Sequence, residues 1–177
     1  MNKMQNATLP NLANSWEADA PAPRNRLVSV SVFAPQLTAG EVIRAAHGSE
    51  RMLWRAPGCC AFAAFGVAAE LFAWGENRIH DIEQQARALF AGAALPSYVP
   101  SEAHPRLMGG FAFRDDFVPD NTWAAFHPAH FILPHVQFVQ MSEQPGGWLS
   151  LNALVSEGEN INDVEASLNE ALQARLA

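Results

Sequence analysis

Aspartate and histidine side chains that could bind a metal ion gather between residues 115 and 135. Asp115, Asp116 and Asp120 lie in one short stretch, and neighbouring carboxylates can converge on a hard cation. Their spacing lacks the alternating acids and the central glycine of a calcium-binding loop. We therefore interpret this stretch as a solvated loop rather than as a cation site.

Three histidines follow in the same region: His127, His130 and His135. A zinc site would require two histidines on one helical face, or a cysteine partner. Pro128 and Pro134 interrupt any helix here, and the adjacent Cys59 and Cys60 point to opposite faces of a strand. The histidines are therefore predicted to be loop and strand residues with ordinary hydrogen bonds.

Other catalytic residue types lack the neighbours that their chemistry needs. Cys59 would require a base and an electropositive setting to act as a nucleophile, so we predict a buried thiol. Gly109 and Gly110 are not followed by the Gly-Lys-Ser/Thr of a phosphate-binding loop. Lys3 is the only lysine and lies in the N-terminal tail. We assign no catalytic, cofactor-binding or metal residue on this chain.

The composition predicts one soluble domain. A chain of 177 residues with 49% hydrophobic residues can bury one sizeable core. The formal charge of -7 argues against unspecific nucleic-acid binding. Two adjacent cysteines do not form a disulfide framework, and we find neither a signal peptide nor a membrane span, which favours a cytoplasmic location. Residues 1–25 are predicted to be a disordered or loosely attached tail, and residues 26–177 a single domain.

The first half of the domain predicts antiparallel strands and two helices. Residues 26–33 alternate apolar and polar residues, as a half-buried strand does. Thr38 and Glu41 form a capping-box pattern that starts a helix ending near Ala46. Three further strands are predicted at 51–55, 59–65 and 68–74, and their short connections require antiparallel pairing. Helical periodicity then covers 78–90.

The second half is organised around a glycine pair. We predict a strand over 106–113, in which Gly109 and Gly110 mark a bulge or a close approach of two backbones. A strand over 129–133 is predicted to end at Pro134. Two further strands, 136–142 and 148–155, are joined by a hairpin turn, and a C-terminal helix covers 161–176. The predicted class is α+β, with mostly antiparallel sheets flanked by about three helices.

Five motifs occur in an order that is typical of one enzyme family. They are Arg51–Pro57 (RMLWRAP), Ala63–Gly66 (AAFG), Pro105–Phe113 (PRLMGGFAF), Trp123–Phe126 (WAAF) and Phe131–Pro134 (FILP). In order and spacing, the chain resembles the N-terminal part of the chorismate-utilising enzymes, most closely the menaquinone-type isochorismate synthase. The resemblance covers residues 26–154 and implies the fold of the N-terminal half of those enzymes.

The resemblance implies a chemistry that this chain does not carry alone. The family converts chorismate to isochorismate with Mg²⁺, a lysine that activates water and a glutamate that protonates the departing hydroxyl. Those residues lie in a C-terminal half that opens with a strand of the type Lys-Val-Val-Leu-Ala-Arg, which is absent here. The resemblance thus implies a non-catalytic N-terminal part, either a fragment or a split-gene subunit, with no cofactor of its own.

Three functions remain open at this point. The first is a supporting part that associates with a catalytic chorismate-binding half, or with itself, because apolar surface would otherwise be exposed. The second is a free-standing small-molecule-binding or scaffold domain derived from the same family. The third is the N-terminal part of another chorismate-utilising enzyme, of the anthranilate or salicylate synthase type.

Overall fold

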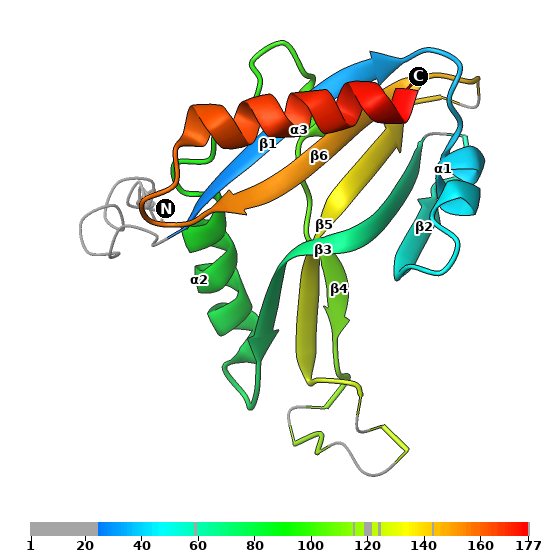
Figure 1. Ribbon diagram of the computed structural model, residues 1–177. Helices are drawn as coiled ribbons and strands as arrows, with labels where there is room; N and C mark the ends of the chain where they lie inside the picture. The colour runs from blue at the N-terminus through cyan, green and yellow to red at the C-terminus, as the bar shows by residue number, and fades with distance from the viewer. Residues whose placement is uncertain are drawn as a thin grey trace, which may run out of the picture.

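The protein is built on one antiparallel sheet of six strands (Figure 1). The computed structural model describes residues 25–58, 60–114, 116–118, 122–123, 125–142 and 144–176. The strand order is β1-β6-β5-β3-β2, and β4 also pairs with β5. The strands are β1 (Arg26–Ala34), β2 (Arg51–Arg55), β3 (Ala61–Ala73), β4 (Met108–Phe111), β5 (Ala129–Gln140) and β6 (Gly147–Val155).

Three α-helices pack on this sheet, so the predicted α+β class is confirmed. They are α1 (Ala39–Ala45), α2 (Arg78–Phe90) and α3 (Ile161–Leu176). The short 3₁₀ helix η2 (Ser101–Ala103) lies within the connection between α2 and β4, which the sequence predicted as a loop. The predicted tail lies almost entirely outside the described residues, as does Cys59.

The main core lies between one face of the sheet and the helices α1 and α3. Figure 1 shows α3, the predicted C-terminal helix, running across β1 and β6, and its buried residues are Leu168 and Leu172. Leu176, one further turn along the same face of the helix, is exposed. The predicted capping box starts α1: Thr38 accepts a hydrogen bond from the Glu41 amide, and Glu41 accepts one from the Thr38 amide.

The prediction of two separate strands at 59–65 and 68–74 was wrong. β3 is one strand of 13 residues that continues through the glycine. Gly66 adopts a φ of +66°, and the pairing with β5 shifts register between Val67 and Ala69. The β-bulge therefore lies directly after Val67, next to the glycine, and it adds a residue and bends the strand without ending it.

The prediction that Pro134 ends a strand was also wrong, because β5 runs unbroken through this residue. β5 pairs with β4 before the proline and with β6 after it, and Pro134 lies opposite the bulge of β3. The missing amide hydrogen therefore falls where the ladder is already irregular. The side chain of Asn152 on β6 bonds the backbone at this irregularity, because its Nδ2 donates to the Pro134 carbonyl at 2.9 Å.

Below the bulge, β3 and β5 leave the main sheet and form a three-stranded arm with β4 (Figure 1). Helix α2 packs on one face of the arm, through Ile82 against Leu71, Ala73 and Ala129. β4 lies so close to β5 that a Cβ atom on Gly109 would stand 2.6 Å from Phe131 Cα and still closer to the His130 carbonyl oxygen. The close backbone approach predicted for the glycine pair is therefore confirmed for Gly109.

Candidate functional site

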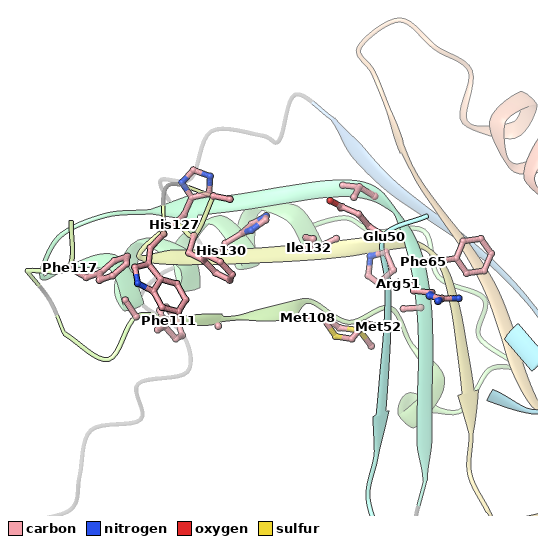
Figure 2. Close-up of a pocket in the computed structure, with 18 of the residues that line it drawn as sticks. Glu50, Arg51, Met52, Phe65, Met108, Phe111, Phe117, His127, His130 and Ile132 are labelled. Atoms are coloured by element: carbon pink, nitrogen blue, oxygen red, sulfur yellow. The ribbon is translucent and has the colours of Figure 1, made fainter. Parts of the chain in front are cut away.

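A groove of about 820 Å³ lies in the described part of the chain. It extends along β4 and β5, from β2 and the bulge of β3 to the segment that follows β4. Figure 2 shows Met52 and Arg51 near Met108 at one end, and Phe111 and His127 at the other. A volume of this size lies within the range of small-molecule sites.

Three glycines shape the groove. Just before the bulge, the Gly66 amide donates to the Glu50 carbonyl oxygen at 3.1 Å, which holds the start of β2 beside the groove. On β4, Gly110 lines the groove, and a Cβ placed on it would meet no atom within 4 Å. Gly109 permits the close approach and Gly110 leaves space, so the two neighbours serve different purposes.

Aromatic rings and imidazoles cluster at the far end of the groove. The His130 ring stacks on Phe72 at 4.4 Å between centroids, and the His127 ring meets the edge of Phe72 at 4.7 Å. Trp74 lies 5.7 Å from His127. His130 Nε2, on β5, is 3.1 Å from a carboxylate oxygen of Glu70, a solvent-exposed residue of the neighbouring strand β3.

The third predicted histidine lies elsewhere. His135 Nδ1 is 2.9 Å from the backbone oxygen of Asn152, between β5 and β6. The structure therefore brings His127 and His130 together but leaves His135 in a separate backbone contact. His130 and His135 are strand residues with hydrogen bonds, as predicted.

Of the three aspartates, only Asp116 lies within the described residues. Arg114 donates to its two carboxylate oxygens at 2.9 and 2.6 Å. These hydrogen bonds hold the pKa of Asp116 below its ordinary value. Because the pair is solvent-exposed, its contribution to stability is small. Asp115 and Asp120 lie outside the described residues.

Cys60 takes part in packing. Its side chain is partly buried and lies against the small cluster of Phe62, Val99, Ala103 and Val139. Its predicted neighbour on the same strand, Cys59, is not described.

The described residues do not fit a magnesium site. They contain no group of three His, Cys, Asp or Glu side chains placed to hold a metal ion. The one described aspartate of the acidic stretch faces an arginine instead. We therefore derive no reaction step through a metal on this part of the chain.

Residues 13–177 match the family described as chorismate binding enzyme. The chain belongs to this family. No curated protein gives a significant match. None of the described helices is both long and apolar enough to cross a bilayer.

Large apolar side chains of this family member are exposed around the groove. Phe113 is fully exposed, and Trp123 and Phe126 expose more than half of their area. Trp123 and Phe126 contact each other at 5.3 Å, across the turn closed by the Phe126 amide and the Trp123 carbonyl. The sequence predicted the glycine pair, but not that β2, β3, β4, β5 and the segment after β4 would meet around one groove.

Proposed function

We propose that this chain is the non-catalytic N-terminal part of an isochorismate synthase, most similar to the menaquinone type. The match to the chorismate binding enzyme family supports the substrate class. The observation that carries the non-catalytic role is the lysine content: Lys3 is the only lysine, so residues 25–177 contain no lysine that could activate water.

In this proposal a second polypeptide segment supplies the catalytic lysine, the acid that protonates the leaving hydroxyl, and the ligands for Mg²⁺. The folded region of this chain supports that catalytic half. Exposed apolar residues around the groove support association, because apolar area removed from water contributes roughly 25 cal/mol per Å². Residues 26–177 act as one domain, and a cytoplasmic location belongs to the same proposal.

The test is an isochorismate-formation assay with chorismate and Mg²⁺. The 177-residue chain is assayed alone and with a lysine-bearing chorismate-binding chain that is inactive by itself. We expect no turnover from the chain alone and turnover from the mixture. Turnover by the chain alone would refute the non-catalytic role, and Asp116 would then be the first residue to replace.

The groove favours a second candidate, a small-molecule-binding domain of the same family. Its volume of about 820 Å³ and its ring cluster suit a compact aromatic or cyclic acid. Calorimetric titration of the chain alone with chorismate and with salicylate tests this function. Binding that Phe111→Ala weakens, together with no rescue of turnover in the mixture, would favour it over the supporting role.

The same mixture addresses the third function. An anthranilate or salicylate synthase would release its own aromatic product from chorismate instead of isochorismate. Chromatographic identification of the product therefore separates these relatives once turnover is restored.

A further inference from the structure

The two edge strands of the sheet, β1 and β2, differ in whether another segment of the chain pairs with them. At β1, the chain after α2 returns and pairs briefly: the Ser29 amide donates to the Ala94 carbonyl at 3.0 Å, and the Ala94 amide to the Leu27 carbonyl at 2.8 Å. At the opposite edge, β2 pairs with β3 alone among the described strands. All five residues of β2 are exposed. An open, largely apolar edge is a template for another strand.

The hydrogen-bond pattern identifies which backbone groups of β2 face outward. The Gly66 amide donates to the Glu50 carbonyl, and the Ala56 amide to the Cys60 carbonyl, so positions 50 and 56 point toward β3. Hydrogen-bonded positions alternate along an antiparallel ladder. Met52 and Trp54 therefore also bond β3, while Arg51, Leu53 and Arg55 direct their amides and carbonyls away from the sheet.

The charge of this edge contrasts with the rest of the protein. Arg51 and Arg55 lie on the same face of β2 with Leu53 between them, because side chains alternate along a strand. Arg51 Nη1 donates to the Ile43 carbonyl of α1 at 2.7 Å, but among the described residues no carboxylate lies within ion-pair distance of either arginine. The whole chain has a net charge of -7, so the edge is a local basic site on an acidic protein.

We propose that β2 is the docking edge for an extended strand of a partner protein, and that this strand carries two carboxylates four residues apart, facing Arg51 and Arg55. Backbone hydrogen bonds would come from positions 51, 53 and 55, and an apolar residue of the partner would lie over Leu53. The inference rests on the proposed function only for the identity of the partner, the catalytic chain.

A second copy of this chain fits the edge poorly. Antiparallel pairing of two β2 strands about Leu53 would place Arg51 of each copy opposite Arg55 of the other. Like charges directly opposite each other destabilise a strand pair. Charge complementarity therefore selects an acidic partner strand over self-pairing.

The experiment uses two synthetic seven-residue peptides. Both consist of threonines around a central valine, and one has glutamates and the other lysines at the second and sixth positions. Binding to the full chain is measured by NMR titration, together with hydrogen exchange of the Leu53 amide. The two charge pairs should make the glutamate peptide bind about tenfold more tightly than the lysine peptide. Its binding should also protect the Leu53 amide.

Two variants separate edge binding from unspecific attraction. Arg51→Glu combined with Arg55→Glu should reverse the preference, so that the lysine peptide binds more tightly. Leu53→Pro removes only an outward amide, which an edge strand tolerates, and should abolish binding of both peptides while the melting temperature stays near that of the parent. A Leu53→Pro variant that unfolds leaves the charge reversal as the deciding test.

Several outcomes would overturn the proposal. They are equal binding of the two peptides, no binding of either, an unreversed preference in the double variant, and concentration-dependent dimerisation that Leu53→Pro abolishes. The last outcome would assign the edge to a second copy. Restored turnover in the mixture without peptide binding would reject the docking edge and keep the proposed function. Peptide binding without restored turnover would keep the docking edge and reject the proposed function.

Discussion

Replacing Gly109 by alanine should detach β4 from β5. The new methyl group would stand 2.6 Å from Phe131 Cα and closer still to the His130 carbonyl oxygen. Both obstacles are backbone atoms of a paired strand, so no side-chain rotation relieves the clash. Gly110→Ala is the matched control, because its methyl group would meet no atom within 4 Å.

The magnitude follows from what must move. Overpacking a well-filled site costs roughly 1–3 kcal/mol, and rigid backbone on the opposing strand places Gly109→Ala at about 3 kcal/mol. For a chain of this size, each kcal/mol lowers the melting temperature by about 2–4 °C, which gives a loss of roughly 6–12 °C. Gly110→Ala should stay within about 0.5 kcal/mol of the parent.

Urea unfolding of the two variants and the parent measures this difference directly. Hydrogen exchange adds a local readout, because a released β4 should lose protection at Met108 and Phe111 while β6 keeps it. Equal urea midpoints for Gly109→Ala and Gly110→Ala would refute the close approach of β4 to β5. A lower midpoint with β4 still protected would refute local release as its cause.

Three further predictions concern polar contacts that hold the frame. Thr38→Ala should cost about 1 kcal/mol at neutral pH, because it removes the helix cap. Hydrogen bonds from Thr38 hold the pKa of Glu41 below its ordinary value. Their stabilisation is therefore complete above the ordinary carboxyl pKa and is lost as the pH falls through the lowered pKa. Urea unfolding of the parent and of Thr38→Ala at neutral and at acidic pH measures the cap penalty and its pH dependence. Gln137→Ala should cost about 2–3 kcal/mol, measured by thermal unfolding, because the buried amide bonds the Arg106 amide and the carbonyls of residues 103 and 104. The hydroxyls of Ser31 and Ser150 lie 2.8 Å apart in the core, so either single alanine variant leaves the other hydroxyl without this partner. In a double-mutant cycle, the double variant should therefore lose less stability than the sum of the losses in the two single variants.

Each of these has an outcome that contradicts it. A Thr38→Ala penalty of equal size in acid would mean that Glu41 takes no part in the cap. Unchanged stability of Gln137→Ala would show that water replaces the amide in the loop it holds. Strictly additive serine effects would mean that the two hydroxyls do not depend on each other.

Local sequence patterns predicted the elements whose contacts are local. Helix α2 begins and ends where its periodicity predicted, and the Thr38–Glu41 box starts α1. Gly66 and Pro134 misled the prediction, because each was interpreted as ending a strand. Pro134 pairs with Val67, the residue that follows Gly66, so both lie beside the same irregularity between β3 and β5, and Asn152 of β6 donates a hydrogen bond to the Pro134 carbonyl. Such compensation comes from pairing between distant residues and leaves no signal in either segment alone.

The groove could not be predicted for the same reason. Its lining comes from β2, β3, β4, β5 and the segment after β4, which only the strand order brings together. The exposure of β2 was equally hidden, since its sequence of three apolar residues between two arginines fits a buried strand as well as an edge. What the sequence did identify was the glycine pair, because a strand that lacks two side chains must approach another backbone or leave a space.

The groove and the open edge share residues, which links the two proposed activities. Arg51 and Met52 belong to β2 and also line the groove. A partner strand added outside β2 would therefore lie beside one end of the groove and would fix Arg51 in an ion pair. Ligand binding to the groove should then differ between the chain alone and the chain with the glutamate peptide bound. If the affinity for chorismate is identical in both states, edge and groove are independent, and the supporting role must be carried by association alone.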